Sequence, residues 1–458
     1  MQMGPYPSFA CKSLHHPLWQ PRWEVRIAIR SDVWALKDIP PLSSTSCTLS
    51  LGSIASEDEN SAVVLEEGFK HSDSTLEASK YKSSTFAIKL LGILRTVGVP
   101  SWQETEIEPS SVKIFQASGS FNTNAVFFVS CPLLPTLLLR IYGTSSGYCI
   151  SRPRELHILK TLSSRYHIGP RVYGTFGNGR VEEYFDSTTL TAPDLRDSVI
   201  SRWIGARMFE LHGVDIEAVL PLTGSEGKSW EIGAEKNVRD WINPAREVLS
   251  LPAVPDTTRA ELDIDGFFTL WEKYMRWLKE FESREGASRR VFAHNDLQYG
   301  NLLRLTLVQE GMPDHHQIII VDLEYASPNP AAFDIATHFH EWTADYHGSH
   351  PHLYDPARYP SLQERRNFYQ GYMSQSSTPS QALSEEDLER ELETMDCQVR
   401  AWSPAPHAMW ALWAIMHARD NFERGEGEPE FDYIGHAKCR LEGFRREVKA
   451  LGVPTSAV

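Results

Sequence analysis

Residues 291–303 read Val-Phe-Ala-His-Asn-Asp-Leu-Gln-Tyr-Gly-Asn-Leu-Leu, a polar loop between two short apolar segments. The loop contains His294, Asp296 and Asn301 in the pattern H-x-D-x-x-x-x-N. In phosphoryl-transfer enzymes with this spacing, the aspartate orients the attacking hydroxyl and the asparagine reaches a magnesium ion. The stretch therefore predicts a catalytic loop between two strands.

A second acidic stretch follows shortly after the loop. Residues 318–324 read Ile-Ile-Ile-Val-Asp-Leu-Glu, which predicts a buried strand that delivers Asp322 at its end. An aspartate there suits Mg²⁺, which such sites hold with few protein carboxylates and with several phosphate oxygens and waters. The alternative is that His294 and Asn301 only stabilise a turn and that Asp296 is an ordinary loop carboxylate. The two stretches in succession favour the catalytic interpretation.

The composition is that of a globular protein. The chain has 458 residues, 13 of them tryptophan, and is long enough to bury a large core in two or three lobes. Its 45 basic and 60 acidic side chains give a formal net charge of −15, which disfavours a nucleic-acid partner and suits a cationic small substrate. No segment is typical of a secretory signal or a membrane span, so we expect a soluble protein without stable membrane insertion.

The cysteines and histidines give no metal-binding pattern. The six cysteines are scattered, with no C-x-x-C pair and no His/Cys ligand spacing, so we expect neither a zinc site nor a disulfide framework. This usage fits the reducing cytoplasm. The histidines at positions 315, 316, 347, 350 and 352 divide between two segments that we interpret as solvated loops.

Residues 1–68 predict an extension that is separate from the rest of the chain. The stretch 42–56 is rich in serine and an acidic run follows it, without hydrophobic periodicity. Such segments are typically flexible or poorly packed.

Residues 69–185 predict a small lobe around an antiparallel sheet. Strand patterns occur at 112–115, 125–129 and 137–142, separated by tight turns. The turn between the first two, residues 117–124, has short hydroxyl side chains and one glycine. Its backbone N–H groups could cover nucleotide phosphates, or it could be a plain hairpin turn.

Arg140 and Glu155 are candidates for an ion pair beside those phosphates. Arg140 lies on the third predicted strand, and Glu155 opens the next helical segment. The pair would imitate the lysine–glutamate pair of kinases, or it could be a purely structural salt bridge.

Residues 186–458 are dominated by helical patterns, among them the amphipathic stretches 199–212 and 265–281. The whole chain therefore predicts an α+β fold. A small antiparallel β-rich N-lobe would join a larger, mostly helical C-lobe, with the nucleotide site in the cleft between them.

Several motifs resemble the choline/ethanolamine kinase family. Residues 321–342 read VDLEYASPNPAAFDIATHFHEW, similar to the family's D-F-E-Y-A/S and F-D-I-x-x-H-F-x-E-W pattern. The catalytic loop and the segments 138–143, 168–174 and 407–413 also match, in the family's order. The resemblance implies a protein-kinase-like fold and transfer of the γ-phosphate of MgATP to the hydroxyl of choline or ethanolamine.

The resemblance also implies roles for the residues that match its motifs. Asp296 would be the catalytic base, Asn301 and Asp322 would bind Mg²⁺, and Gln298 and Glu324 would support this geometry. The catalytic set is His294, Asp296, Gln298 and Asn301, and the metal set is Asp322, Asn301 and Glu324. The ATP-binding set is Ser118, Gly119, Ser120, Asn122, Asn124, Arg140 and Glu155. Leu323 departs from the family, which commonly has an aromatic residue there.

The amine pocket implied by the resemblance consists of Glu341, Trp342, Asp345, Tyr346, Trp410, Trp413 and Tyr433. The trimethylammonium group of choline has no N–H to donate, so its site must offer aromatic ring faces with carboxylates nearby. Trp410 and Trp413 are three residues apart and would share one helix face, although such a stripe is often only core packing. The resemblance favours choline, giving phosphocholine in the first step of phosphatidylcholine synthesis from choline.

Other functions stay open. The chain could prefer ethanolamine or accept both amines. An aminoglycoside-type kinase would share the catalytic loop but lack the Glu341-Trp342 motif and the two tryptophans, and a non-catalytic relative should have lost Asp296, Asn301 or Asp322. Family members are often dimers, so the resemblance also allows a homodimer.

Overall fold

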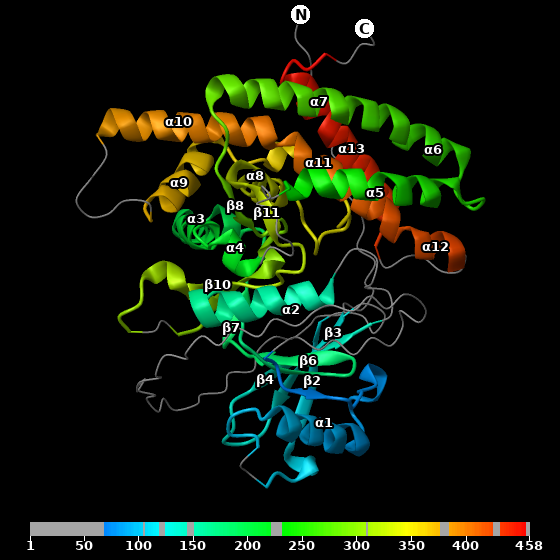
Figure 1. The fold of residues 1–458 in the computed structure, drawn as a ribbon, viewed down its shortest axis with the longest axis vertical. Coiled ribbons are helices and arrows are strands. Elements are labelled where there is room, and N and C mark those ends of the chain that lie inside the picture. The colour runs from blue at the N-terminus through cyan, green and yellow to red at the C-terminus, as the bar shows by residue number, and fades with distance from the viewer. Residues whose placement is uncertain are drawn as a thin grey trace, which may run out of the picture. The chain divides into compact units, whose positions relative to one another are not determined.

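The computed structural model describes residues 68–103, 106–118, 124–143, 151–220, 231–307, 310–375, 384–424 and 431–454. The chain divides into two units, Met1–Glu59 and Asn60–Val458, and every described residue belongs to the second. The extension predicted at residues 1–68 therefore lies, except for Gly68, outside the described residues. Figure 1 labels the helices and strands of the second unit.

A six-stranded sheet forms the smaller part of this unit. Its strands lie in the order β1-β5-β6-β4-β3-β2, and every neighbouring pair is antiparallel except β1 and β5. They are β1 (His71–Ser72), β2 (Lys113–Ser118), β3 (Asn124–Ser130), β4 (Leu137–Tyr142), β5 (Val172–Phe176) and β6 (Gly179–Glu183). The three strands predicted from the sequence are confirmed as β2, β3 and β4.

Helix α1 (Ser84–Val97) packs on one face of this sheet (Figure 1). Its N-cap Ser83 accepts a hydrogen bond from the Phe86 amide, and Gly98, at φ 68°, ends it in the left-handed conformation. Alternate residues of β3 and β4 are buried because successive strand side chains face opposite sides of a sheet. Phe127 and Leu139 thus share one core with the apolar face of α1.

Helices form most of the rest of the unit. They are α2 (Arg152–Thr161), α3 (Ser198–His212), α4 (Ile216–Val219), α5 (Gly233–Ser250), α6 (Asp256–Leu262), α7 (Ile264–Glu285), α8 (Ala331–Glu341), α9 (Leu362–Met373), α10 (Glu385–Trp402), α11 (Pro404–His417), α12 (Arg419–Arg424) and α13 (Tyr433–Ala450). In Figure 1, α2 lies between the sheet and the other helices. The predicted α+β, protein-kinase-like fold with a β-rich N-lobe and a helical C-lobe is confirmed.

Five short strands carry the predicted catalytic segments within the helical part. They are β7 (Ser187–Thr189), β8 (Arg290–Ala293), β9 (Leu302–Leu305), β10 (Ile318–Ile320) and β11 (Ser327–Pro330). β9 pairs with both β7 and β10, and β8 pairs with β11. The loop at 294–301 thus runs from β8 to β9, and the segment with Asp322 runs from β10 to β11.

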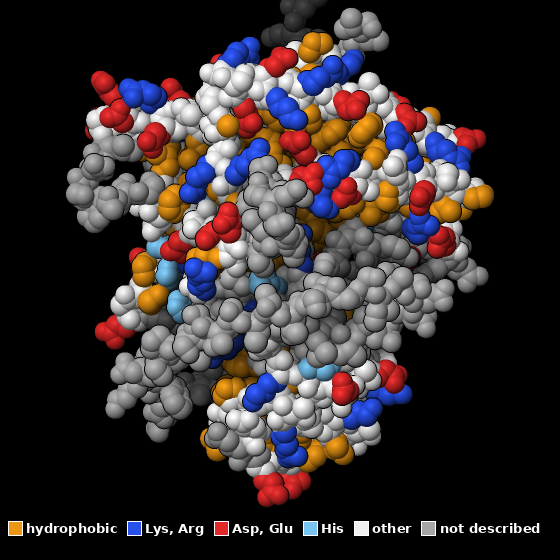
Figure 2. Space-filling view, viewed as in Figure 1, with side chains coloured by type: hydrophobic (Ala, Val, Ile, Leu, Met, Phe, Trp, Pro, Cys, Tyr) orange, Lys and Arg blue, Asp and Glu red, His pale blue; other side chains and the backbone are white. Residues whose placement is uncertain are grey.

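The described surface of the helical part shows no segregation of charge on the face in Figure 2. Acidic and basic side chains are interspersed over the helical part on the face shown in Figure 2. Among the described helices, none combines the length and apolar character that crossing a bilayer requires. A lobe boundary at residue 185, a homodimer and a cytoplasmic location stay predictions.

Candidate active site

A buried aspartate on α8 holds the catalytic loop. Asp334 is fully buried and accepts hydrogen bonds from the backbone amides of His294 (2.9 Å) and Asn295 (2.7 Å). His212 Nε2 on α3 lies 2.9 Å from the same carboxylate. Burial alone would raise the pKa of Asp334, but His212 and the loop lower it below its usual value. Sequence reasoning quoted Asp334 within a motif but gave it no role.

His294 connects the loop to the segment that contains Asp322. Its Nε2 lies 2.9 Å from the Val321 carbonyl, and its Nδ1 accepts a hydrogen bond from the Asp296 amide (3.2 Å). Nε2 therefore carries the proton and the imidazole is neutral, in line with burial, which lowers its pKa. Because the backbone uses both ring nitrogens, His294 positions the loop and has no proton to exchange with a substrate.

Asn301 orients the predicted base. Its side-chain amide donates to the Asp296 carbonyl (2.8 Å) and to Asp296 Oδ2 (3.0 Å). Burial raises the pKa of the Asp296 carboxyl well above its usual value, and the charges of Glu341, Asp322 and Glu324 raise it further, while the Asn301 amide opposes them. The carboxyl thus lies among like charges, where an added cation would favour its ionised form.

Gln298 has a backbone role within the loop. Its side-chain oxygen accepts a hydrogen bond from the Gly300 amide (3.1 Å) and caps the 3₁₀ turn Tyr299–Asn301. The turn places the Asn301 side chain against Asp296. The described contact of Gln298 is thus with the loop backbone, and its predicted support of the metal and hydroxyl geometry stays a prediction.

Three carboxylates lie close enough to share a cation. Ligand atoms of Glu155, Asp322 and Glu324 all lie within 4.8 Å of one another. Asp322 Oδ1 is buried without a hydrogen-bond partner, 3.6 Å from Arg140 Nη1. Burial, together with the charges of Asp322 and Glu155, raises the pKa of Glu324 to about 8. An orphaned oxygen among crowded acids fits Mg²⁺, which prefers oxygen ligands.

The backbone has an unusual conformation in the catalytic loop and in the segment that contains Asp322. Asn295 and Asp322 have φ values of 68° and 64°, in the left-handed region that non-glycine residues rarely adopt. At Asn295 the turn presents two consecutive amides to Asp334. Asp322 follows β10 at the end of the predicted strand, as expected.

The arginine–glutamate pairing differs from the prediction. Glu155 accepts from Arg152 (2.7 Å) and pairs with Arg180 (2.8 Å), which is fully buried. Arg140 instead lies 3.6 Å from Asp322 and 3.7 Å from Glu182. The predicted Arg140–Glu155 pair is therefore wrong as a direct contact, because β6 brings Arg180 between them.

Arg152 and Arg180 were missed by sequence reasoning. Arg152 Nη2 donates to Asn124 at the start of β3 (3.0 Å), and its Nη1 lies 3.4 Å from Glu324. Arg180 lies on a strand between apolar residues, and a buried-strand arginine is the only signal that could have found it. Burial would raise the pKa of Glu155, but Arg180, Arg152 and Arg140 together lower it to about 2.

The predicted ATP-covering turn is only partly described. Gly119, Ser120 and Asn122 lie outside the described residues. The backbone of Ser118 ends β2, and Asn124 begins β3. These two strands pair with each other, so the turn joins adjacent antiparallel strands as predicted.

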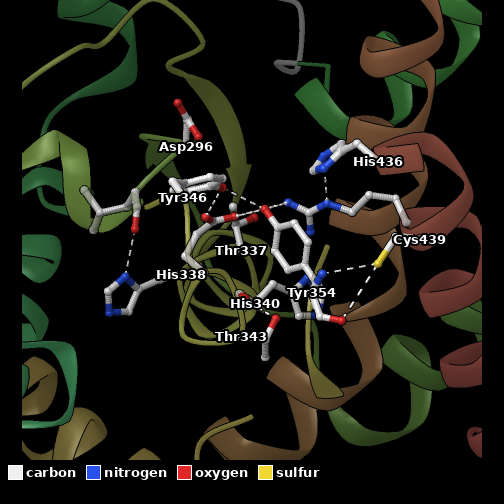
Figure 3. A network of polar contacts seen from close by, with 12 residues as sticks. Asp296, Thr337, His338, His340, Thr343, Tyr346, Tyr354, His436 and Cys439 are labelled. Atoms are coloured by element: carbon white, nitrogen blue, oxygen red, sulfur yellow. Dashed lines mark hydrogen bonds and ion pairs between the residues drawn. The ribbon is translucent and has the colours of Figure 1, made fainter. Parts of the chain in front are cut away.

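Glu341 and Tyr346, two residues predicted for the amine pocket, belong to a network of polar side chains (Figure 3). Glu341 Oε2 accepts from the Tyr346 hydroxyl, and Oε1 accepts from the Tyr354 hydroxyl (2.8 Å) and from Arg440 Nη2 (3.1 Å). The two tyrosine hydroxyls lie 2.9 Å apart. In Figure 3, Asp296 lies beside Tyr346 at one edge of this network. Tyr354 and Arg440 were missed, since neither belongs to a motif quoted from the sequence.

The aromatic residues predicted for the pocket meet one another. The Trp413 ring centroid lies 5.4 Å from that of Trp410 and 5.7 Å from that of Tyr433. Tyr325 joins them, with its ring 5.1 Å from Trp410 and its hydroxyl accepting from Trp413 Nε1 (2.8 Å). Tyr325 was part of a quoted motif but was not assigned to the pocket.

Trp342 and Asp345 lie apart from this group. The Trp342 ring is buried against Phe339, and its indole N–H donates to His338 (3.2 Å), so it packs as a core residue and its assignment to the pocket stays a prediction. The Asp345 side chain is 52% exposed and lies 3.8 Å from Arg358. The assignment of Asp345 to the pocket likewise stays a prediction.

Comparison with known proteins gives consistent matches over most of the chain. The profile of a family described as Choline/ethanolamine kinase matches residues 116–445. The choline kinase of Schizosaccharomyces pombe is 32% identical over 425 residues, covering 80% of this chain and 90% of that protein. The choline kinase of Saccharomyces cerevisiae is 31% identical over 502 residues, covering 90% and 82%. A crystal structure of choline kinase from Cryptosporidium parvum Iowa II superposes with a TM-score of 0.60 at 27% identity, covering 79% and 95%.

Proposed function

The chain belongs to the choline/ethanolamine kinase family, and from this premise we propose that it transfers the γ-phosphate of MgATP to the hydroxyl group of choline. It is an ATP-dependent kinase with an alcohol as acceptor, and the product would be phosphocholine for phospholipid synthesis. The observation that supports the reaction best is the half-buried Asp296, held by Asn301 beside the cluster of Glu155, Asp322 and Glu324.

The chain's own residues would position both substrates. Asp322 and Glu324, with Asn301 at their side, would hold Mg²⁺, which neutralises phosphate charge when bound. Arg140, whose Nε is buried without a hydrogen-bond partner, and Arg152 would face the phosphates. Asp296 would accept a hydrogen bond from the choline hydroxyl and align it for in-line attack. Most of the rate enhancement would come from this positioning and from charge neutralisation.

The network around Glu341 favours choline over ethanolamine. A primary ammonium needs acceptors for its N–H groups, yet both Glu341 oxygens already accept from Tyr346, Tyr354 and Arg440. The cluster of Trp410, Trp413, Tyr433 and Tyr325 instead offers aromatic ring faces, which attract a quaternary ammonium without hydrogen bonds.

Steady-state ADP release with MgATP tests this proposal, with choline, ethanolamine and no amine compared over a concentration series. We expect kcat/KM for choline to exceed that for ethanolamine by at least about tenfold, which corresponds to about 1.4 kcal/mol of transition-state preference. The reverse order would identify an ethanolamine kinase. Release that does not depend on either amine would overturn the assignment of the pocket.

A further inference from the structure

A cluster of two histidines and a glutamate lies outside the catalytic machinery. His340 is on α8, His407 on α11 and Glu447 on α13. Glu447 Oε1 lies 3.3 Å from His407 Nε2 and 3.5 Å from His340 Nε2. In Figure 3, His340 lies on the side of Tyr354 opposite to Asp296. The sequence gave no sign of the cluster because its members are far apart along the chain.

Several polar atoms of this cluster are buried without a partner. His407 is 3% exposed, and neither of its ring nitrogens has a hydrogen-bond partner. His340 Nδ1 and Glu447 Oε2 are also buried without a hydrogen-bond partner. Leaving a buried polar group unsatisfied costs about 1–3 kcal/mol, so several at one place indicate a missing ligand. The two imidazole rings lie against each other with centroids 4.0 Å apart.

The main chain of α13 is shaped for the His407 ring. A Cβ atom added at Gly443 would lie 2.6–2.9 Å from three atoms of this ring, closer than van der Waals contact allows. Glycine at this position therefore lets the imidazole lie against α13, one helical turn before Glu447.

The donor set and its spacing suit a transition metal. Two histidines and one glutamate are a known ligand set for Zn²⁺, with bonds of about 2.0–2.2 Å. Tetrahedral ligands at such bond lengths are separated by about 3.3 Å, close to the separations from Glu447 to the two histidines. Imidazole ligands favour Zn²⁺ and its neighbours over Mg²⁺ and Ca²⁺.

Space for a further ligand adjoins the cluster. A cavity of about 270 Å³ is lined by all three side chains and by Ser403, Tyr359 and Cys439, among others. Ser403 Oγ lies 2.9 Å from His340 Nε2. If that nitrogen coordinates a metal, the Ser403 hydroxyl becomes available to hydrogen-bond a metal-bound water, which would complete the shell.

We propose that His340, His407 and Glu447 bind one divalent transition-metal ion, for which Zn²⁺ is the best fit. The ion ties together α8, α11 and α13. These helices carry Glu341, the two tryptophans and Arg440, respectively, so the ion stabilises the amine half of the molecule without entering the phosphoryl transfer.

A second cluster in the described part of the chain provides a matched control. His315 and His316 Nε2 lie 2.8 and 3.0 Å from Glu210 Oε1, and Arg207 pairs with the same carboxylate. Both Glu210 oxygens are thus already hydrogen-bonded, whereas Glu447 Oε2 has no hydrogen-bond partner and Arg446 Nη2 lies 3.8 Å from Glu447 Oε1. We therefore expect His316→Asn to leave metal binding unchanged.

The test is Zn²⁺ binding by chelator-stripped protein without nucleotide and with excess Mg²⁺, measured by competition with a chromophoric chelator. We expect one Zn²⁺ per chain for the wild type and for His316→Asn. Glu447→Gln and His340→Asn should each weaken binding by at least about 100-fold. Co²⁺ added to the wild-type protein should give the intense visible absorption of a four-coordinate site.

Three outcomes would overturn the proposal. One is the absence of stoichiometric Zn²⁺ binding to the wild type, which would indicate that a bridging water satisfies the polar atoms of the cluster. Another is wild-type affinity in both Glu447→Gln and His340→Asn, and the third is loss of binding in His316→Asn. Because the Co²⁺ spectrum uses the unmodified chain, the proposal stays testable even if a variant fails to fold. None of these measurements depends on kinase activity.

Discussion

At the scale of single residues, the position of Asp296 is set by its neighbours in the loop. Its carboxyl is fixed by Asn301, and His294 fixes the backbone on which it sits. Ionising this carboxyl costs free energy, because burial and the nearby carboxylates raise its pKa. Such a cost is expected where a group is placed for chemistry and not for stability.

Asp296→Ala should lower kcat by at least about 100-fold, because the variant cannot align or accept the proton of the substrate hydroxyl. The residues proposed to contact the nucleotide do not include Asp296, so the dissociation constant of MgATP should stay within about twofold of the wild type. Steady-state kinetics and isothermal titration check the two quantities. Near-normal turnover would show that another group orients the hydroxyl.

Glu155→Gln should make stability less dependent on acid pH. The pKa of Glu155 is depressed from 4.5 to about 2, so its contribution is present above pH 4.5 and is lost as the pH falls through 2. The shift corresponds to roughly 3 kcal/mol of stability at neutral pH. Urea unfolding at several pH values should show a wild-type advantage that shrinks between pH 4.5 and 2.

The control for this measurement is Glu280→Gln, at an exposed position on α7. Its unfolding free energy should follow that of the wild type at every pH. A constant difference between wild type and Glu155→Gln across this range would contradict the assigned ion pairs with Arg152 and Arg180.

At the scale of elements, α11 brings together two of the rings that are predicted for the amine pocket. Trp410 and Trp413 are three residues apart, and their rings meet at 5.4 Å. α13 brings Tyr433 to the same place. The predicted amine pocket therefore depends on how α11 and α13 pack against each other.

Trp413→Ala should raise the KM for choline roughly tenfold and leave the KM for ATP nearly unchanged. The expected loss is the cation–π attraction of one ring, about 1–2 kcal/mol at a desolvated site. Initial rates over a grid of both substrates check this. An equal rise in both constants would show that the ring is only structural.

Gly443→Ala tests the contact between α13 and α11. The new methyl group would collide with the His407 ring, so we expect a loss of about 1–3 kcal/mol in unfolding free energy. Gly92→Ala on α1 is the matched control, because no other group lies within 4 Å of a Cβ there. That variant should gain about 0.5–1 kcal/mol, since alanine favours a helix over glycine.

The sequence predicted elements better than the contacts between them. The strands around the loop and Asp322 follow from local apolar runs, so their positions were correct. The pairing of Glu155 with Arg180 depends on strand β6 lying beside β4, which no local pattern encodes, whereas Arg152 lies three residues before Glu155 on α2. Tyr354 and Arg440 were missed for the same reason, since they reach Glu341 only through tertiary packing.

At the scale of the whole molecule, the chain divides after residue 59. The matched family profile begins only at residue 116, and all the site residues lie in the second unit. The second unit thus contains every group that the proposed reaction needs.

A chain that begins at Asn60 should therefore keep the kcat/KM for choline and the melting temperature of the full-length protein, both within experimental error. A chain that begins at Ser83 also lacks β1, which pairs with β5 through His71 and Ser72, and should unfold at a lower temperature. Calorimetry and initial rates compare the three chains. A large loss of activity in the first truncation would assign residues 1–59 a part in catalysis or regulation.

The left-handed backbone at Asn295 and Asp322 has a consequence for how this chain can evolve. Glycine adopts such a conformation at lower cost than residues with a Cβ atom, by about 1 kcal/mol. Selection for low backbone strain alone would therefore favour glycine at position 322, whereas the proposed role in phosphoryl transfer requires an aspartate there. In lineages released from that demand, we expect glycine at 322 to appear only together with a change at Arg140, which would otherwise lose the carboxylate that lies 3.6 Å from its Nη1.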